Sequence, residues 1–477
     1  MQIIRLLPLL LVSMSMAACG SKTRAPGPTT TSPPPPTATA RAILLPSATP
    51  KPSPTPRPTA TPFQSSLTRM EKLPERCHES PMGLPGEGLI EVAYIPSGFC
   101  MYGELDLFET GGQLYVVQSL LDARPSLAPP AFVITDVTDS SQASIIGAWQ
   151  WNAPTYTADV KTFRQGERWY LAVSRQPASF FSGVCLAAGG LVVVEVTDPA
   201  NPQLIGVFTG SNTGSAQDWC SPHTVQVSHD ANGDGAYLYA STQDTFDLHV
   251  LDIRDLDHVT EAGHYAHPEA GFHNQRDLYF VHDTTIAGDR VYVAYWSAGL
   301  IILDRRKLEA GESVTPLNPL DSIAPFGLDI HHAFPTVDGQ FVFVEDEVNF
   351  APPQSQLRMY DIRDLAAPKK VAAISLDDPF SAPHNLLVSG DLLFVGWYSD
   401  GVRVFKYDTS DPDHPSVEPY AFKAVRAKRT VGIIVENDIY DGIWGVRLHD
   451  CVLGGQPQTC VYASDLTRGL IILALEP

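Results

Sequence analysis

One short unit recurs along this chain, and it constrains the fold more than any other feature. Each copy is an apolar, β-like segment that ends in a turn rich in Asp or Pro, as in GLVVVEVTDPANPQ at residues 190–203. Two further β-like segments precede each copy, and most copies are followed by a fourth. Four short strands per unit of about 40 to 50 residues are typical of a β-propeller blade.

Seven copies of this unit predict seven blades. They are AFVITDVTDSSQ (131–142), the copy at 190–203, DLHVLDIRDLDHV (247–259), GLIILDRRKLEAG (299–311), QLRMYDIRDLAAP (356–368), GVRVFKYDTSDPDHP (401–415) and GLIILALEP (469–477). No fourth segment follows the last copy, and an unpaired edge strand is a liability. We therefore expect residues 88–96, GLIEVAYIP, to pair beside it. The predicted fold class is all-β, a seven-bladed β-propeller closed by an N-terminal strand that completes the last blade.

The residues before the propeller have the pattern of an export signal and a linker. Residues 1–19 contain one charged side chain, Arg5, a short apolar run and the sequence Met16-Ala17-Ala18-Cys19. The run is too short for a permanent membrane span. Residues 20–62 are rich in Pro and Thr, which predicts a disordered, extended stalk. The predicted domains are a signal peptide (1–19), a stalk (20–62) and the propeller (63–477).

The end of that signal resembles the lipobox of bacterial lipoproteins. The resemblance implies that Cys19 is lipid-modified and becomes the first residue of the mature protein, while the alternative is ordinary secretion with cleavage nearby. It places the propeller on the extracytoplasmic side, anchored to a membrane by its N-terminal lipid. The net charge of −21, from 53 acidic and 32 basic residues, argues against nucleic acid as a partner.

The repeat itself closely resembles the LVIVD-repeat family of bacterial surface propellers. The segment GLVVVEVTDPANPQLIGVF at residues 190–208 carries the resemblance, which extends over residues 88–477. It implies a propeller at the cell surface, and it implies no particular reaction.

A polar residue, often histidine, recurs where each unit begins. Because the first strand of a propeller blade lines the central channel, equivalent positions form a ring around the axis. Imidazole is a common ligand of zinc, copper and iron. The ring therefore predicts a transition-metal site, similar to the four axial histidines that hold iron in carotenoid-cleaving oxygenases; the alternative is that these histidines bond to neighbouring backbone. The predicted metal ligands are His223, His282, His332 and His384, and the other ring positions are Asp106, Asp159 and Trp444.

Two matching aromatic pairs predict a ligand pocket on the same face. They are Tyr295-Trp296 and Trp397-Tyr398, each followed by a serine. Aromatic rings with polar groups around a concavity suit a small ligand, whereas the alternative is packing between adjacent blades. The predicted ligand-binding residues are Asp106, Asp159, Arg276, Trp296, Trp397 and Trp444, with His273, Asp277, Asp329 and His331 nearby.

Six cysteines remain besides Cys19, and an even number in an exported domain predicts three disulfides. We expect the pairs Cys77–Cys100, Cys185–Cys220 and Cys451–Cys460.

Two functions follow from these observations. The first is a lipid-anchored surface module that binds an extracellular protein, a glycan or a small molecule. The second is an exported metal-dependent enzyme, with an oxidoreductase as the candidate class, whose ligands are the four ring histidines. An enzyme of this kind needs the imidazoles to converge, whereas a binding scaffold does not.

Overall fold

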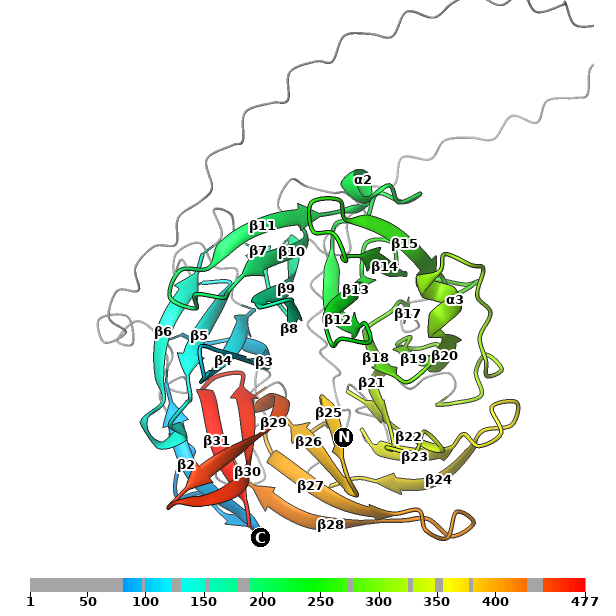
Figure 1. Cartoon of the computed structure of the whole chain (residues 1–477). Coiled ribbons are helices and arrows are strands. Elements are labelled where there is room, and N and C mark those ends of the chain that lie inside the picture. Colours follow the sequence, from blue (N-terminus) through cyan, green and yellow to red (C-terminus); the bar gives the residue numbers. More distant parts are fainter. Residues whose placement is uncertain are drawn as a thin grey trace, which may run out of the picture. The chain divides into compact units, whose positions relative to one another are not determined.

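A computed structural model describes residues 80–96, 99–121, 130–150, 155–177, 189–272, 278–324, 329–347, 355–376, 381–426 and 441–476. The predicted signal peptide with Cys19 and the predicted stalk lie outside these residues. The described part is almost entirely β-strand, and its small antiparallel sheets stand in a ring around a central axis (Figure 1). This confirms the predicted seven-bladed propeller. None of the described helices is long and apolar enough to cross a membrane.

The blades follow the chain order, and the first strand of each lies nearest the axis. The first blade has β3 (Tyr102–Thr110), β4 (Gln113–Leu120), β5 (Phe132–Asp136) and β6 (Ser144–Trp149). The second has β8 (Val160–Gln165), β9 (Arg168–Pro177), β10 (Gly190–Glu195) and β11 (Gln203–Phe208), together with the short strand β7 (Thr155–Tyr156). The third has β12 (Pro222–His229), β13 (Gly235–Thr242), β14 (Leu248–Asp252) and β15 (Thr260–Tyr265). The four-residue helix α2 (Gly210–Thr213) joins the second blade to the third.

The fourth blade has three strands, and helix α3 (Arg305–Glu309) follows its third strand. The small hairpin of β16 (Gly271–Phe272) and β17 (Leu278–Tyr279) precedes this blade. The three strands of the fourth blade are β18 (Asp283–Ala287), β19 (Arg290–Ala294) and β20 (Leu300–Asp304), and the fifth blade has β21 (Ile330–Pro335), β22 (Phe341–Asp346), β23 (Leu357–Asp361) and β24 (Lys369–Ile374). The sixth blade has β25 (Leu386–Ser389), β26 (Leu392–Trp397), β27 (Gly401–Asp408) and β28 (Ser416–Lys423). The seventh has β29 (Ile443–Leu453), β30 (Gln456–Asp465) and β31 (Gly469–Leu475).

An N-terminal strand closes the ring, as predicted. Strand β2 (Leu89–Ile95) pairs antiparallel with β31 and supplies the fourth strand of the last blade. The short strand β1 (Gly86–Glu87) pairs with β28 of the sixth blade. The N-terminal segment therefore joins two neighbouring blades.

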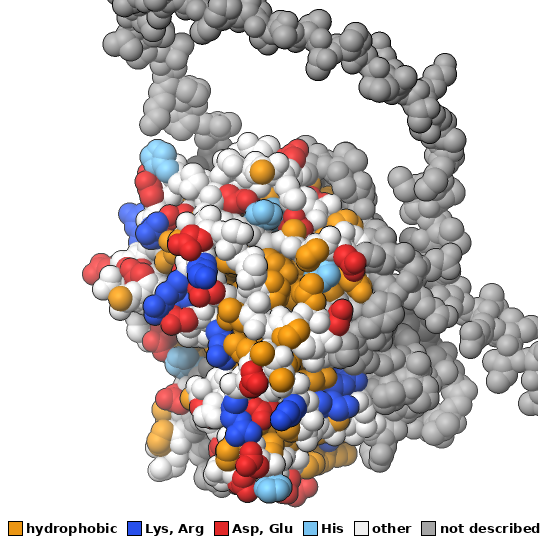
Figure 2. Space-filling model, turned by 90° about the vertical axis from the view of Figure 1, so that its right-hand side faces the viewer, with side chains coloured by type: hydrophobic (Ala, Val, Ile, Leu, Met, Phe, Trp, Pro, Cys, Tyr) orange, Lys and Arg blue, Asp and Glu red, His pale blue; other side chains and the backbone are white. Residues whose placement is uncertain are grey.

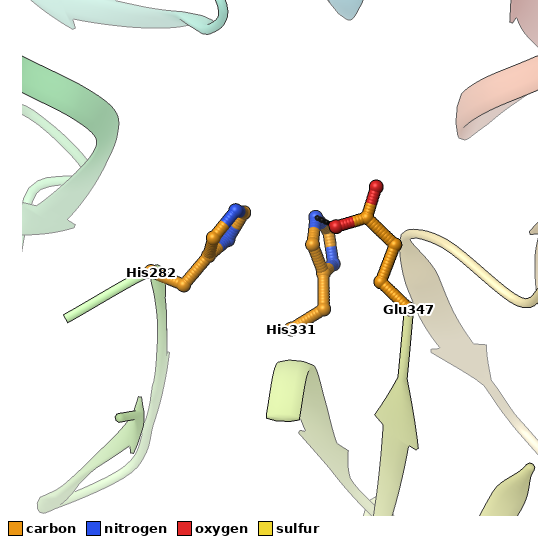
Figure 3. A group of neighbouring side chains, drawn as sticks. All are labelled: His282, His331 and Glu347. Carbon is orange, nitrogen blue, oxygen red and sulfur yellow. Dashed lines mark ion pairs between the residues drawn. The ribbon is translucent and has the colours of Figure 1, made fainter. Parts of the chain in front are cut away.

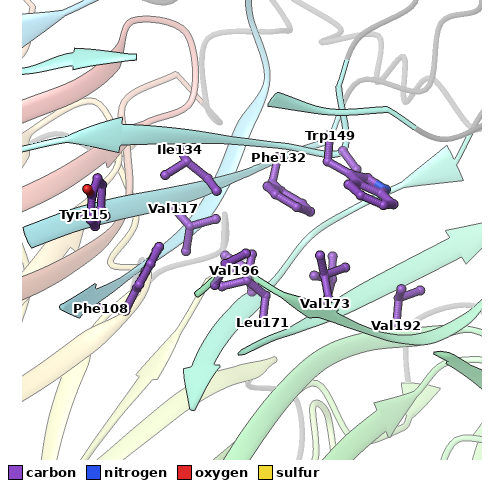
Figure 4. Packing of buried hydrophobic residues seen from close by; sticks show 13 residues of the cluster. Phe108, Tyr115, Val117, Phe132, Ile134, Trp149, Leu171, Val173, Val192 and Val196 are labelled. Atoms are coloured by element: carbon purple, nitrogen blue, oxygen red, sulfur yellow. The ribbon is translucent and has the colours of Figure 1, made fainter. Parts of the chain in front are cut away.

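The apolar runs of the repeat are buried on both faces because the blades pack face to face. Between the first two blades, Phe108, Phe132, Leu171 and Val192 belong to one continuous hydrophobic cluster (Figure 4). Each blade boundary repeats this arrangement with other residues, so the central strands read as Val, Ile and Leu with little alternation.

The Asp-containing turns after the third strands share one hydrogen bond. The Asp198 carboxylate accepts from the backbone N–H of Ala200 at 3.2 Å, and Asp139, Asp255, Asp364 and Asp411 accept in the same way from the residue two positions later. Asp favours this turn because its short side chain replaces a backbone acceptor. On the outer side of the ring, acidic and basic side chains are interspersed (Figure 2).

Candidate functional site

A β-bulge at the start of the inner strands creates the site. In β21, Ile330 pairs with Asp346 and His332 with Glu345, which leaves His331 between them without a partner in the ladder. His223 in β12 and Trp444 in β29 are skipped in the same way. A bulge re-aims one side chain and terminates regular pairing. The side chains of two consecutive residues therefore lie at different heights along the propeller axis, which we call the upper and the lower level.

The upper level holds four histidines from four consecutive blades. The ring centroids of His223 and His282 are 4.5 Å apart, those of His282 and His331 4.1 Å, and those of His331 and His384 3.9 Å. All four side chains are buried. The Nε2 atoms of His223 and His282 are separated by 3.1 Å. Each imidazole therefore lies beside the next one around the axis, and of the four described rings only those of His282 and His331 are grouped, with a nearby carboxylate, as ligands that could share one ion.

Three of the four imidazoles are oriented by a polar atom at Nδ1. His223 Nδ1 lies 2.9 Å from the side-chain oxygen of Gln176, His331 Nδ1 lies 2.7 Å from Glu345 Oε1, and His384 Nδ1 lies 2.5 Å from the backbone oxygen of Trp444. When Nδ1 donates to these acceptors, each Nε2 keeps its lone pair. Within the described residues, His384 Nε2 has no hydrogen-bond partner.

A carboxylate completes the cluster. Glu347 follows β22, and its Oε2 lies 4.0 Å from His331 Nε2 while its Oε1 lies 4.0 Å from His384 Nε2. The Tyr398 hydroxyl donates to Glu347 Oε1 at 2.5 Å. His282, His331 and Glu347 each offer a ligand atom within 4.8 Å of the others, and their side chains point towards a common volume at the axis (Figure 3).

Burial sets the protonation of these groups. It lowers the pKa of His223 to about 4 and that of His384 to about 3, and it holds the pKa values of His282 and His331 well below the ordinary value. The imidazoles are therefore neutral at physiological pH, as metal ligation requires. Burial raises the pKa of Glu347 to about 7.

The lower level of the axis is a polar cavity of about 180 Å³, which we call the axial chamber. Every blade contributes lining residues through its inner strand or the residue just before it. They are Glu104, Asp106, Lys161, Gln226, Asp283, Thr285, His332, Phe334, Asn385, Leu386, Leu387 and Arg447. Asp283, His332 and Asn385 directly follow His282, His331 and His384 in sequence, so the two levels alternate along the chain.

The chamber contains a network of buried ion pairs. Arg447 lies 3.4 Å from Glu104 and 3.3 Å from Asp106, and Lys161 pairs with Asp159. Burial opposes ionisation of Glu104, but Arg447 and Lys161 hold its pKa below the usual range. Asp283 has no such close cation, and burial together with Asp159 raises its pKa to about 8.

The structure places one predicted metal ligand, His332, outside the histidine cluster. His332 is not in the cluster, because its Nδ1 accepts from the backbone N–H of Leu386 at 3.0 Å and its Nε2 lies 3.1 Å from Thr285 Oγ1. The bulge shifts the unit by one residue, so His331 takes the place beside His282 and His384. Two histidines stand side by side at 331–332, and the alignment of the repeats alone cannot tell which of them faces His282 and His384.

The predicted ligand-binding residues do not share one pocket. Trp444 and Trp296 belong to the upper level, where their rings lie 4.3 Å from that of His384 and 4.9 Å from that of His282. Asp106 and Asp159 belong instead to the network of ion pairs at the lower level. The residue equivalent to Asp159 in the first blade is Glu104 and not Asp106, because the backbone oxygens of Glu104 and Asp159 accept from corresponding serines, Ser119 and Ser174. Arg276, with His273 and Asp277, lies outside the described residues.

Trp397 was predicted to face the ligand pocket but lies in the core between blades. Its side chain is fully buried and packs with Phe405 and Leu393. Strand alternation turns the next residue, Tyr398, towards His384. Trp296 is the counterpart of Tyr398, since each forms a bridge with the next blade, and it has a positive φ of 41°. The position facing the site is thus the second residue of each aromatic pair.

The cysteines agree with the prediction where they are described. Cys451 and Cys460 form a disulfide across β29 and β30, with Cα atoms 5.7 Å apart. Cys100 and Cys220 are also disulfide-bonded. Their predicted partners, Cys77 and Cys185, lie outside the described residues.

Comparison with known families finds the LVIVD repeat at residues 184–209 and 281–304, the second of which contains His282. No curated protein sequence matches the chain.

Several solved structures are similar to the chain at low sequence identity. The periplasmic gluconolactonase PpgL of Pseudomonas aeruginosa is 15% identical, with 76% of this chain and 96% of that one covered and a TM-score of 0.48. A protein from Lactobacillus plantarum is 14% identical over 75% and 94%, with a TM-score of 0.49. The β-propeller domain of Cps50 (Swd1) from Myceliophteria thermophila is 12% identical over 81% and 99%, with a TM-score of 0.48.

Proposed function

Since this chain is an LVIVD-repeat β-propeller, we propose that its axis holds a divalent transition metal and that the protein is a metal-dependent enzyme. The ligands are His282, His331 and Glu347, and His223 and His384 flank them. The observation that carries this proposal is the orientation of three imidazoles by acceptors at Nδ1. Metal-ligating histidines almost always have such a partner, which fixes the ring and its tautomer.

The chemistry of the donor set fits a metal. Two imidazoles and one carboxylate offer ligand atoms within 4.8 Å of one another, which is the donor set of catalytic zinc sites that keep an open position. Within the described residues, His282 Nδ1 is buried without a partner. Without a cation, His282 Nε2–H donates to His223 Nε2, and a bound cation replaces this hydrogen bond.

Imidazole with one carboxylate suits zinc, copper or iron. Such an ion supplies Lewis-acid chemistry, or redox chemistry if it is copper or iron, and we favour an oxidoreductase. The protein's residues have separate roles around it. Glu345 positions His331, the Trp444 carbonyl positions His384, and Tyr398 positions Glu347. Glu347 must lose its proton before it can ligate the ion, because burial brings its pKa to about 7.

The experiment is a measurement of metal content in the purified full-length protein without a histidine tag. We compare the protein with the double variant His282→Ala/His384→Ala. The matched control is His258→Ala/His414→Ala, which removes two histidines that are 80% and 85% exposed in surface turns. We expect near-stoichiometric metal in the protein and the control, and none in the axial variant.

Two results would refute the metal centre. One is a protein that stays metal-free after incubation with Zn²⁺, Cu²⁺ and Fe²⁺. The other is full retention of metal by a folded His282→Ala/His384→Ala variant.

Export and lipid anchoring through Cys19 are part of the same proposal. The Cys451–Cys460 disulfide supports an oxidising compartment outside the cytoplasm, where such bonds persist. Incorporation of a labelled fatty acid tests the anchor, and Cys19→Ala must abolish the label. A displayed module that binds an extracellular partner is the second candidate function. It is favoured by a groove beside the axial chamber, which is lined by Asp106, Trp169 and His229.

A further inference from the structure

The axial chamber lies next to the histidine cluster but has a different chemical character. Its lining contains no described metal-ligand group of the kind formed by His282, His331 and Glu347. Arg447 and Asp106 are its most exposed charged residues, with side chains 19% and 18% accessible, and they mark its mouth. At about 30 Å³ for each water, the cavity of about 180 Å³ has room for roughly six waters. It therefore suits a small molecule.

Two carboxylates that line the chamber, and that of Asp159 beside Lys161, already have hydrogen bonds at both oxygens. Glu104 accepts from Leu105 N at 3.0 Å and from the Asn385 amide. Asp106 accepts from Thr162 N at 2.7 Å and from Arg447 Nε at 3.3 Å.

Asp159 accepts from Val225 N at 2.8 Å and from Lys161. These acids are therefore committed to the fold. They do not form an open cation site.

Other groups at the chamber keep unused capacity. An ammonium has three donors, and Lys161 uses one of them on Asp159. Among the residues that the structure describes, Arg447 uses Nε and Nη1, which leaves Nη2 available. Asp283 accepts one bond, from Thr284 N at 2.6 Å. Asn385 Oδ1 is buried without a partner among the described residues. Donors and acceptors are thus presented together, and the charges of the lining nearly balance.

A groove of about 470 Å³ adjoins this chamber. It is lined by Asp106, Thr162, Phe163, Arg164, Trp169, His229 and Gly233. Asp106 lines both cavities, with Oδ1 on Arg447 at the chamber and Oδ2 on Thr162 at the groove. Trp169 is partly buried in this groove beside Arg164 and His229. An amphipathic aromatic side chain surrounded by polar groups is suited to a ligand with one apolar and one polar face.

We propose that the chamber and the groove together bind a carbohydrate, with one sugar unit in the axial chamber and the next against Trp169. A hydroxyl both donates and accepts, so an uncharged polyhydroxylated ligand can satisfy Lys161, Arg447, Asp283 and Asn385 at once. A charged ligand finds no comparable excess of the opposite charge. The C–H face of a second sugar ring can pack on the indole of Trp169. This site does not require the proposed metal.

The test titrates the purified protein with glucose, galactose, maltose and cellobiose by calorimetry, before and after treatment with a chelator. Sodium acetate and methylammonium chloride are the charged comparison probes. We expect glucose to bind in the millimolar range or tighter, maltose or cellobiose to bind at least tenfold tighter than glucose, and galactose to report how selective the chamber is. Trp169→Ala should reduce the disaccharide to the affinity of the monosaccharide. Tyr420→Ala, an exposed aromatic on β28, is the matched control and should change nothing.

A second variant separates the two units. Arg447→Gln should weaken the monosaccharide at least tenfold, with circular dichroism and melting checking that the propeller still folds.

The proposal is overturned if the folded protein binds none of the four sugars. It is also overturned if only acetate or methylammonium binds, or if Trp169→Ala leaves disaccharide affinity unchanged. Sugar binding that persists after the chelator treatment shows that this site does not depend on the metal centre.

Discussion

His331 and His332 are adjacent in sequence, yet their side chains belong to different levels of the axis. His331 lies with its ring 4.1 Å from that of His282 and 3.9 Å from that of His384, whereas His332 bonds to Thr285 and Leu386 in the axial chamber. One bulge in β21 separates a candidate metal ligand from a residue of the fold. This pair gives the sharpest test of the site.

We expect His331→Ala to lose the metal and His332→Gln to keep it. The first substitution removes an imidazole from the cluster, while glutamine at 332 retains a donor and an acceptor for Thr285 and Leu386. Elemental analysis of both purified variants provides the measurement. Equal metal content in the two would contradict the assignment of levels.

Glu345 should tune the metal through His331, which it contacts at 2.7 Å. Loss of such an outer partner typically costs about 10–100-fold in metal affinity. We expect Glu345→Ala to show a decrease of that size in competition with a chromophoric chelator. Asp361→Ala is a control, because that carboxylate pairs with Arg363 on the outer side of its blade. A decrease in the control as large as in Glu345→Ala would point to general destabilisation.

The metal affinity should depend on pH through Glu347. Its charged form exists mainly above the pKa of about 7, and a metal needs that form, so affinity should rise with pH and level off above 7. A single competing proton corresponds to about tenfold in affinity per pH unit below 7. His223 and His384 contribute nothing in this window, because their pKa values are about 4 and about 3. Titrations between pH 5.5 and 8 should show that Glu347→Gln depends on pH by one proton less than the unchanged protein.

The two members of the aromatic pairs should behave differently. Trp397 is fully buried between blades, so Trp397→Ala should lower the free energy of unfolding by about 3–5 kcal/mol. Trp296 is less buried and stacks on His282, so Trp296→Ala should affect stability less and alter metal binding instead. Denaturant unfolding with both variants, together with their metal content, tests this. The reverse ranking of the two stabilities would place Trp296 in the core.

Ring closure should be essential for a soluble propeller. A chain shortened to begin at residue 97 lacks β1 and β2 and leaves β31 with an unpaired edge. Exposed edges of this kind template association with other chains. We expect the shortened chain to aggregate, while one that begins at residue 80 stays monomeric in light scattering. Monomeric, cooperatively folded material from the shorter chain would show that closure is dispensable.

The fold could be predicted because the strand-and-turn pattern of one blade occurs seven times in the sequence. The apolar third strand, its Asp turn and the missing last strand were enough to predict the blades and the closing strand β2. The fourth blade departs from the pattern in having α3 after β20, and its sequence RRKLE shows no strand alternation.

The site was predicted only in part, since its geometry depends on residues that no repeat pattern distinguishes. Glu345 and Glu347 lie at the end of a second strand, 14 and 16 residues after His331, and the antiparallel pairing of β22 with β21 brings them beside the histidines. Arg447 and Glu104 come from opposite ends of the chain. A bulge shifts side chains by one position without changing the composition, so the repeat pattern predicts His332 instead of His331.

The N-terminal segment has a mechanical consequence. Residues 86–95 lie first along β28 of the sixth blade and then along β31 of the seventh, and Lys423 ties them down by donating to Leu84 O at 2.6 Å and by pairing with Glu91. A tension applied through the residues before Gly86 therefore reaches the propeller at a seam between two blades. The load is divided between two sheets before it can pull on β2, which holds the ring shut. A pull on the residues before Gly86 therefore separates the short strand β1 from β28 before it can separate β2 from β31.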